Sequence, residues 1–419
     1  MKTYRTLFSI LFLLCFDIIF CVAQVEQPRM ERGVIDLRQW DFEKQGEVKL
    51  NGSWHFSWKQ LLSPSEINKA NSKDYFEFPS VWNGKSSVYE KLSGQGFATY
   101  SADVLFDSTV SVLSISLPDF YCNYILWVNG KRLASNGKVG TSRKDSEGQW
   151  LPLTVIFPVR ESTLHFVLQV SNFQHNKGGC NDDIYLGLPE QQYQKRELAV
   201  ISNIILFGGL GLIGFFFVIL FFFFRHEKAA LYFAAICITW AIRSVFTNLY
   251  LFINWMPNFD FELGAKIEYL ALYLTATWGV LFVSNLFPED TNQKVKNVML
   301  ILNSLFILVT LATPAFTYSM LLSAYLVLVW IILCYVAFVV VMAIIYGRKG
   351  AWFSVISILL GIIMFSYDLL TFTEFLNFNP LVFNIGYITI FLLNATAFAY
   401  QLSQTITPKQ KIDLDWSIK

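Results

Sequence analysis

Residues Leu198–Phe224 read LAVISNIILFGGLGLIGFFFVILFFFF, and this uninterrupted apolar stretch decides the class of the fold. It carries no charged side chain, and it is long enough to cross the roughly 30 Å hydrocarbon core of a bilayer with some tilt. The whole chain is 54% hydrophobic and only 15% charged, whereas soluble domains carry about 25% charged residues. The sequence therefore predicts an integral membrane protein.

Six further apolar stretches follow the first one along the chain. They are expected at Ala229–Phe252, Gly264–Phe287, Val298–Phe316, Tyr318–Tyr346, Ala351–Thr373 and Pro380–Ser403. Each is long enough for a membrane helix, although only a very short turn separates the fourth helix from the fifth. We therefore predict an all-α bundle of seven transmembrane helices over residues 196–403.

The region before these helices is polar and contains many short alternating runs. Trp54–Trp58 and Leu164–Val170 alternate apolar and polar residues as half-buried strands do. Tyr124–Val128 leads into Asn129-Gly130, which is a strong hairpin signal. These runs predict an all-β, two-sheet sandwich over residues 24–195. The aromatic residues expected in its core are Trp54, Phe56, Trp82 and Trp127.

The first residues have the layout of a signal peptide. Lys2 and Arg5 precede an apolar run from Leu7 to Phe20, and cleavage is expected after Ala23. The run is too short to span the bilayer comfortably, so an additional membrane helix fits less well. We therefore expect residues 1–23 to be removed and the sandwich to be exported.

Basic residues are distributed asymmetrically over the connections between the predicted helices. If the sandwich lies outside, the inner connections are Arg225–Lys228, Pro288–Lys296 and Gly347–Gly350, and each holds two Lys or Arg residues. The outer connections hold none. This pattern follows the positive-inside rule. We therefore expect a periplasmic or extracellular N-terminal domain, and a short cytosolic tail at residues 404–419.

Short motifs follow one another along the N-terminal region. They are Leu37–Phe42, Leu50–Trp58, Pro79–Asn83, Gly96–Tyr100, Val128–Gly130 and Val170–Gly179. Their order, followed by seven spans, resembles the bacterial seven-transmembrane receptors with diverse intracellular signalling modules. The resemblance implies that the exported sandwich is a galactose-binding-like jelly roll. It also implies that the chain is a receptor in the bacterial inner membrane.

Members of that family carry a cyclase, histidine kinase or phosphatase module after the helices, and residues 404–419 contain none of these. We therefore expect a receptor-like signal transducer that binds a small ligand, either a carbohydrate or a carboxylate, and signals through a separate cytosolic partner. A truncated or split signalling enzyme is one alternative, and a solute transporter or capture protein is another. A homodimer is also left open.

The sequence contains no recognised pattern of catalytic or metal-binding residues. It has four histidines and no P-loop, H-E-x-x-H or paired-cysteine motif, so we predict no enzyme, no metal and no cofactor. With 32 basic and 31 acidic residues, the chain has no global attraction to nucleic acid. Two exported cysteines, Cys122 and Cys180, either form a disulfide or remain as buried thiols.

A loop after a predicted strand is the candidate binding site of the sandwich. Loops on a rigid sandwich often carry binding groups, and His and Asn side chains hydrogen-bond sugar hydroxyls or carboxylates while aromatic rings stack on a ligand. The alternative is that Asn172 only shapes the turn and Phe173 packs in the core. The predicted ligand-binding residues are Tyr121, Trp150, Asn172, Phe173, His175 and Asn176.

Four ionisable residues fall within the predicted membrane helices. Counted from the inner face, Arg243 lies roughly 21 Å deep and Asp368 roughly 26 Å deep, while Lys266 and Glu268 lie near the outer face. Such residues are usually paired or functional. We predict that Arg243 pairs with Asp368 or Glu268 and couples the helices. A static ion pair, or snorkelling of Lys266, is the alternative.

Overall fold

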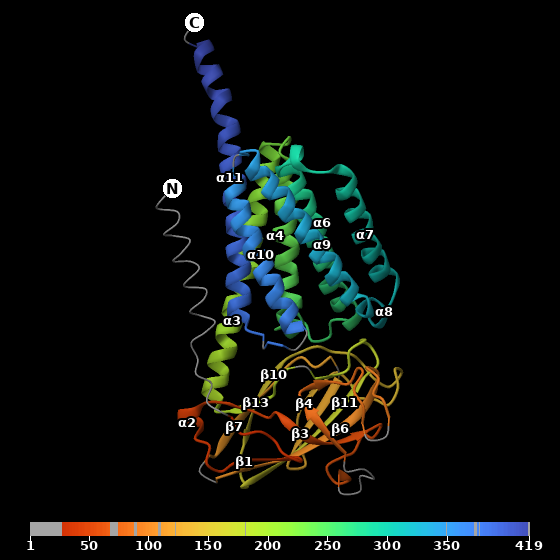
Figure 1. Cartoon of the computed structure of the whole chain (residues 1–419). Helices are drawn as coiled ribbons and strands as arrows, with labels where there is room; N and C mark the ends of the chain where they lie inside the picture. The colour runs from red at the N-terminus through yellow and green to blue at the C-terminus, as the bar shows by residue number, and fades with distance from the viewer. Residues whose placement is uncertain are drawn as a thin grey trace.

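The computed structural model describes residues 27–67, 74–87, 90–107, 110–121, 123–180, 182–348, 350–372, 375–376 and 378–417, with side chains as far as Ser403. The predicted signal peptide and the side chains of the predicted tail lie outside this description. Figure 1 shows a β-sandwich and a helical bundle stacked end to end.

Two facing sheets form the sandwich. The larger, seven-stranded sheet has the order β4-β3-β6-β11-β8-β9 with β1 beside β6, the smaller has the order β10-β7-β13-β2, and β12 pairs with β5. The strands are β1 (Val34–Leu37), β2 (Val48–Lys49), β3 (Gly52–Trp58), β4 (Asp74–Phe78), β5 (Ser80–Val81), β6 (Gly96–Phe106), β7 (Val112–Leu117), β8 (Asn123–Val128), β9 (Lys131–Asn136), β10 (Leu153–Pro158), β11 (Thr163–Asn172), β12 (Gly179–Cys180) and β13 (Tyr185–Gly187). A short helix, α2 (Phe42–Gln45), lies between β1 and β2.

Large aromatic side chains fill the space between the sheets. Trp54 and Phe56 of β3, and Trp82 directly after β5, are buried in this core, as predicted. The indole Nε1 of Trp82 donates a hydrogen bond to the Tyr100 hydroxyl at 2.7 Å, so its polar atom is satisfied in the apolar interior.

The β8–β9 hairpin confirms one prediction and corrects another. Asn129 and Gly130 both have positive φ angles, 47° and 74°, which is the backbone that a two-residue type I′ turn requires. Trp127, in contrast, is only half-buried, because Tyr124 and Leu126 are the strand residues that face the core. The prediction that Trp127 lies in the core is therefore wrong, because the core-facing residues of β8 are its neighbours in the alternating pattern.

Seven helices are long and apolar enough to cross a membrane, as predicted. They are α3 (Pro189–Phe223), α4 (Lys228–Phe246), α6 (Phe261–Leu286), α7 (Gln293–Ala312), α9 (Leu322–Ile345), α10 (Ala351–Phe372) and α11 (Pro380–Ser417). The short elements α5 (Leu251–Trp255), η2 (Pro288–Asp290) and α8 (Ala315–Met320) lie in the connections.

Polar side chains mark the starts of several helices. The Asp260 carboxylate accepts a hydrogen bond from the Leu263 N–H at 2.7 Å and begins α6, and Asn292 accepts from Lys294 N at the start of α7. These caps satisfy N–H groups that have no partner within a helix. The first helix begins at Pro189, directly after β13, so α3 is continuous with the sandwich.

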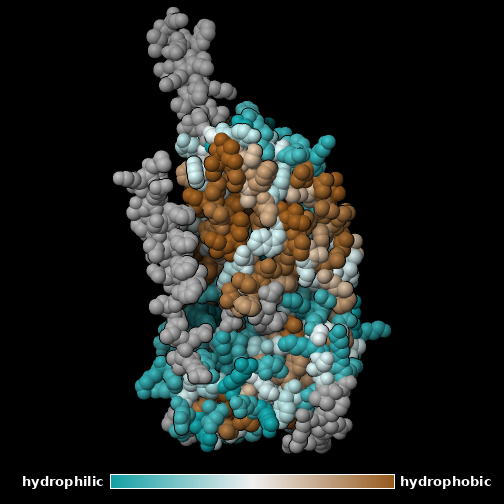
Figure 2. All heavy atoms as spheres, in the orientation of Figure 1, coloured by the Kyte–Doolittle hydropathy of each residue, from teal (hydrophilic) through white to brown (hydrophobic). Residues whose placement is uncertain are grey.

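The surface of the bundle is apolar where the helices face outward. Figure 2 shows a hydrophobic belt over the helices, with hydrophilic residues over the sandwich and at the opposite end. Leu212 and Phe223 of α3 are 74% and 78% exposed. Such exposure is unfavourable in water and favourable in lipid, so the belt is the surface that contacts a bilayer.

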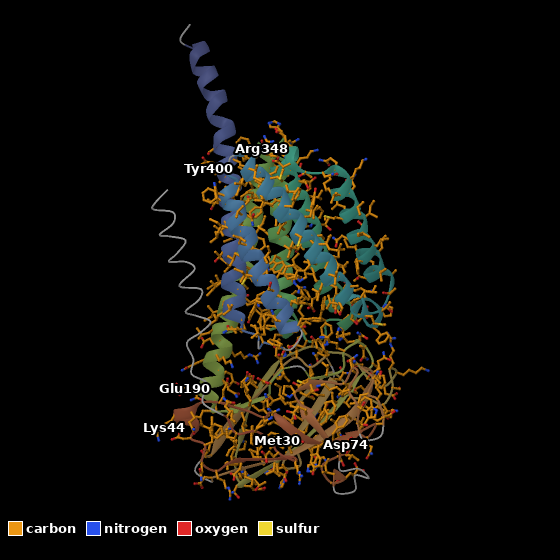
Figure 3. The ribbon with its side chains drawn as sticks, viewed as in Figure 1. Met30, Lys44, Asp74, Glu190, Arg348 and Tyr400 are labelled. Carbon is orange, nitrogen blue, oxygen red and sulfur yellow. The ribbon has the colours of Figure 1, made fainter. Side chains whose placement is uncertain are left out.

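Salt bridges connect two of the turns at the end of the bundle away from the sandwich. In Figure 3, Arg348 lies at that end, while Met30 and Asp74 lie in the sandwich. The Arg348 guanidinium contacts the Glu289 carboxylate at 2.5 Å and the Asp290 carboxylate at 3.1 Å. This links the turn between α9 and α10 to η2.

Candidate functional site

A cavity of about 930 Å³ lies where the sandwich meets the bundle. Its lining comes from sandwich loops and from α3, α4, α6, α9, α10 and α11. Figure 2 shows the surface hollowed at the same level, between the sandwich and the helices. The volume is at the upper end of the range of cavities that enclose a single small ligand.

The loop that follows β11 forms hydrogen bonds with three helices of the bundle. His175 Nε2 lies 3.2 Å from the Tyr269 hydroxyl of α6. The Asn176 N–H donates to Ser319 Oγ of α8 at 3.0 Å, and Lys177 Nζ donates to the main-chain oxygen of Phe372 in α10 at 3.1 Å. The predicted binding loop is therefore also the contact between the two regions.

His175 is enclosed by aromatic rings. Its ring stacks on Tyr121 with centroids 4.9 Å apart, and the edge of Trp150 meets it at 5.4 Å. The residue is 4% exposed, and this burial lowers the pKa of His175 to about 4. The imidazole is therefore neutral at pH 7 and acts as a hydrogen-bonding group rather than as a cation.

Trp150 continues this aromatic contact into the helical region. Its ring lies 4.8 Å from Phe261 at the start of α6, and 6.0 Å from Tyr250 just before α5. Rings from the sandwich and from the connection between α4 and α6 therefore pack in one cluster beside the cavity.

The structure divides the six predicted ligand-binding residues into two groups. Tyr121, Trp150 and His175 line the cavity, whereas Asn172, Phe173 and Asn176 do not. The Asn172 amide donates to the main-chain oxygens of Gly94 and His175, both at 2.7 Å. Its side chain therefore shapes the loop, and a role in direct ligand contact is not supported for it.

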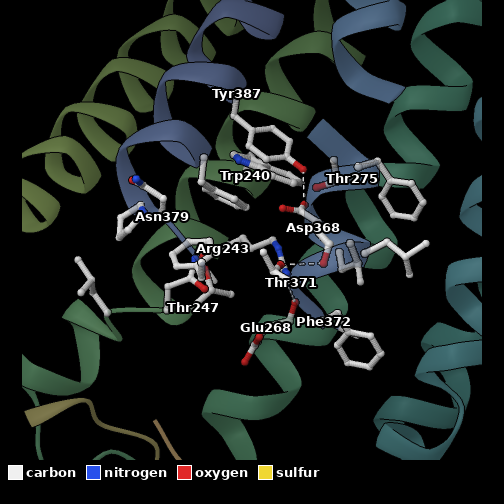
Figure 4. Close-up of a pocket in the computed structure, with 18 of the residues that line it drawn as sticks. Trp240, Arg243, Thr247, Glu268, Thr275, Asp368, Thr371, Phe372, Asn379 and Tyr387 are labelled. Atoms are coloured by element: carbon white, nitrogen blue, oxygen red, sulfur yellow. Dashed lines mark hydrogen bonds between the residues drawn. The ribbon is translucent and has the colours of Figure 1, made fainter. Parts of the chain in front are cut away.

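Three of the four predicted intramembrane ionisable residues line the same cavity: Arg243, Glu268 and Asp368 (Figure 4). Arg243 Nη1 donates to the main-chain oxygen of Glu268 at 2.8 Å, which links α4 to α6. The Tyr387 hydroxyl donates to Asp368 Oδ2 at 2.6 Å, which links α10 to α11.

The predicted direct ion pair is not formed. Among the described residues, no carboxylate oxygen lies within 4.0 Å of the Arg243 guanidinium. The reason is that Arg243 is held by a main-chain oxygen and Asp368 by a tyrosine. Lys266 lies outside the cavity lining and contacts Glu262 at 3.7 Å, one helical turn away on α6.

Asp119, after β7, is a cavity residue that the sequence did not single out. Enclosure of its carboxyl group, together with the nearby carboxylates of Asp182 and Glu268, raises the pKa of Asp119 well above its ordinary value. Three carboxyl groups therefore gather near the outer end of the cavity. Within the described residues, no group of His, Cys, Asp and Glu side chains has an arrangement that could hold a metal ion.

Other residues of the junction had weak signals in the sequence. Lys177 belongs to the loop already singled out, and Tyr269 directly follows Glu268. Tyr250 and Tyr387 had no signal, since a tyrosine near the end of an apolar helix is a common feature of membrane interfaces.

The predicted pairing of Cys122 with Cys180 stays a prediction, because Cys122 lies outside the described residues. Cys180 is buried, and its Sγ lies 3.0 Å from the main-chain oxygen of Asp182.

Comparison with solved structures finds only partial likeness. The β-glucuronidase of Ruminococcus gnavus has 13% identity and a TM-score of 0.25, over 33% of this chain and 28% of that one. A GH2 β-galacturonidase from Eisenbergiella tayi, bound to galacturonate, has 13% identity and a TM-score of 0.25, over 34% of this chain and 24% of that one. The match thus spans about a quarter of those proteins, and likeness this weak carries no argument about function.

Comparison with protein families is more informative. No curated protein matches the chain. Residues 200–403 match the family described as 7TM diverse intracellular signalling, and these residues include most of the seven membrane-length helices. The membrane-spanning region therefore belongs to the 7TM diverse intracellular signalling family, and the protein is a multi-pass membrane signalling protein with an N-terminal β-sandwich.

Proposed function

We propose that the protein is a receptor that binds a small ligand in the cavity between the sandwich and the helices. The observation that carries this proposal is the shared lining, in which Trp150 and His175 come from the sandwich and Arg243 and Asp368 from the helices. A ligand in this cavity contacts both regions at once. Its affinity therefore depends on how the two regions are placed, which is the requirement for a ligand to shift a conformational equilibrium.

Polar links between helices provide the route for the signal. The Arg243 contact joins α4 to α6, and the bond from Tyr387 to Asp368 joins α10 to α11. A ligand that carries hydroxyl groups or a carboxylate competes for these same donors and acceptors. Binding then changes the packing of the four helices, and a carbohydrate or a carboxylate remains the proposed ligand class.

The proposal places the sandwich in the periplasm and the opposite end of the bundle in the cytosol. Because α3 begins at the sandwich, its other end and the following connection, with Arg225 and Lys228, lie at the far end of the bundle. Lys294 is at the start of α7, and Arg348 is in the connection between α9 and α10, at that same end. This charge distribution supports the orientation, and a cytosolic partner with an acidic surface would dock there.

The test uses the full-length chain in lipid nanodiscs and a panel of galactose, glucuronate and succinate. A compound that binds the folded protein raises the melting temperature, and hydrogen exchange is then measured with and without that compound. We expect slower exchange around the cavity and altered exchange at residues 225–228 and 288–296. If exchange changes only around the cavity, the protein captures or transports a solute and does not transmit a signal.

A separate experiment tests the orientation. Trypsin added to intact spheroplasts should cleave the sandwich at exposed residues such as Lys138 and Lys144. It should cleave at Arg225 only after the membrane is permeabilised. Cleavage at Arg225 in intact spheroplasts would reverse the proposed orientation.

A further inference from the structure

The cavity extends far into the helical bundle. On α4 its lining runs from Phe233 to Arg243, which is roughly 15 Å, and on α9 from Leu322 to Val336, which is roughly 21 Å, at 1.5 Å per residue. The linings on α6, α10 and α11 have comparable lengths and run over Glu268–Val283, Ser357–Phe372 and Pro380–Asn394. The cavity is therefore a long space parallel to the helices.

Charge is confined to one end of this space. Arg243, Glu268 and Asp368 lie toward the sandwich, and among the described lining residues deeper in the bundle no side chain is charged. The deeper walls are mainly apolar, and they include Ile236, Leu272, Val280, Val329, Ile332 and Phe365. A polar ligand would leave its hydrogen-bonding groups without partners there, whereas an apolar chain would match the walls.

Arg243 forms no salt bridge with any described carboxylate, since none has an oxygen within 4.0 Å of its guanidinium. Lys195 and Arg196 of α3 also line the cavity, where Lys195 pairs with Glu47 of the sandwich. Among the described lining residues of α4, α6, α9, α10 and α11, Arg243 is the only basic one. Its Nη1 contacts a main-chain oxygen, its guanidinium lies 5.8 Å from the Trp240 ring, and its Nε is buried without a hydrogen-bond partner among the described residues. A guanidinium cannot lose its proton, whereas a carboxylate such as Glu268 can gain one. The charge that needs a counter-ion is therefore the positive one.

We propose that the cavity binds an amphiphile with a single long apolar chain and an anionic head group, chemically of the fatty-acid type. This inference rests on the proposed function, because it takes the same cavity as the ligand site. The head group forms a charge-assisted pair with Arg243. The chain lies along the apolar walls and away from the sandwich.

The first experiment measures binding to the full-length chain in phosphatidylcholine nanodiscs with tritiated hexadecanoate. We expect saturable binding. Octanoate and hexadecanol should compete at least tenfold less well, because octanoate lacks the long apolar chain and hexadecanol lacks the negative charge. Arg243→Gln should weaken hexadecanoate binding at least tenfold. Lys266→Gln is the matched control, since Lys266 is basic and on α6 but outside the lining, and it should bind as the wild type does.

A glycine of the lining, Gly279, permits a test of where the chain lies. A Cβ atom at Gly279 meets nothing within 4 Å, so a Phe side chain there fills the space without an initial clash. Gly279 lies roughly 16 Å from Glu268 along α6. Gly279→Phe should therefore lose hexadecanoate binding and retain octanoate. Gly208→Phe on α3 is the control, because Gly208 also has open space but lies outside the lining.

The results separate this inference from its rivals. Unchanged hexadecanoate binding in Arg243→Gln or in Gly279→Phe would overturn it, as would the absence of saturable binding to the wild type. Complete displacement by phosphatidylglycerol in the nanodisc would also overturn it, because the occupant would then be a two-chain bilayer lipid. If hexadecanoate does not bind but glucuronate changes exchange at residues 225–228, only this inference fails. If hexadecanoate binds without that change, the receptor proposal fails.

Discussion

The Nε2 atom of His175 lies 3.2 Å from the hydroxyl oxygen of Tyr269, and the two residues are 94 positions apart in the chain. His175 belongs to the loop after β11, and Tyr269 belongs to α6. Both side chains are buried and both line the cavity. This contact therefore joins the sandwich to the membrane bundle at the place where a ligand would bind.

The first prediction concerns acid. Burial lowers the pKa of His175 from 6.5 to about 4, so between these values the unfolded chain binds a proton that the folded chain excludes. The contribution of the neutral His175 to the free energy of unfolding is fully present above pH 6.5. It is lost as the pH falls toward 4, and the loss is on the order of 3 kcal/mol. The stability advantage of the wild type over His175→Gln should therefore shrink over this range, as measured by thermal unfolding at each pH. A constant difference would contradict the prediction.

The second prediction concerns Lys177, whose ammonium group contacts α10. It donates to the Phe372 main-chain oxygen at 3.1 Å and lies 3.6 Å from the Phe372 ring centroid. Lys177→Met removes a charge-assisted hydrogen bond and a cation–π contact, which we expect to cost about 1–3 kcal/mol of docking free energy. Hydrogen exchange in residues 172–179 should rise, while Lys131→Met, on the exposed hairpin, should leave it unchanged. Equal exchange in both variants would show that Lys177 does not hold the loop.

The third prediction concerns the bond between α10 and α11. Asp368→Asn removes the charge of the acceptor, and Tyr387→Phe removes the donor, of a 2.6 Å hydrogen bond. Their effects on the free energy of unfolding should not be additive, with an interaction energy of about 1 kcal/mol or more. Thr389→Val combined with Asp368→Asn is the control, because the Thr389 hydroxyl bonds within its own helix, to the Ile385 oxygen. That pair should be additive, and additivity of both pairs would argue against coupling through Asp368.

The fourth prediction concerns the core of the sandwich. Tyr100→Phe removes the acceptor of the Trp82 indole and leaves a buried donor without its partner. We expect a loss of about 1–3 kcal/mol of stability. Tyr75→Phe, at a side chain that is 39% exposed, should change stability by less than about 0.5 kcal/mol. Denaturant unfolding of the full-length chain, followed by near-ultraviolet circular dichroism, distinguishes the two.

Local patterns predicted much of the fold and part of the candidate site. The hydropathy of Leu198–Phe224 predicted a membrane helix, and alternation predicted the buried Trp54 and the hairpin at Asn129. The same reasoning placed Trp127 in the core, one residue out of register. The sequence also singled out Arg243, Glu268 and Asp368, because ionisable residues are rare in membrane helices. The ion pair it predicted for Arg243, with Asp368 or Glu268, is replaced by a hydrogen bond to the main-chain oxygen of Glu268.

The sequence by itself determined the seven spans, the β-sandwich before them and the distribution of basic residues, because hydropathy, alternation and charge are properties of neighbouring residues. Only the tertiary structure decided that His175 meets Tyr269, that Asp368 binds Tyr387 and not Arg243, and that Trp150 and Arg243 line one cavity. These contacts join residues far apart in the chain. They depend on how rigid helices and sheets pack against one another, and no local pattern encodes that packing.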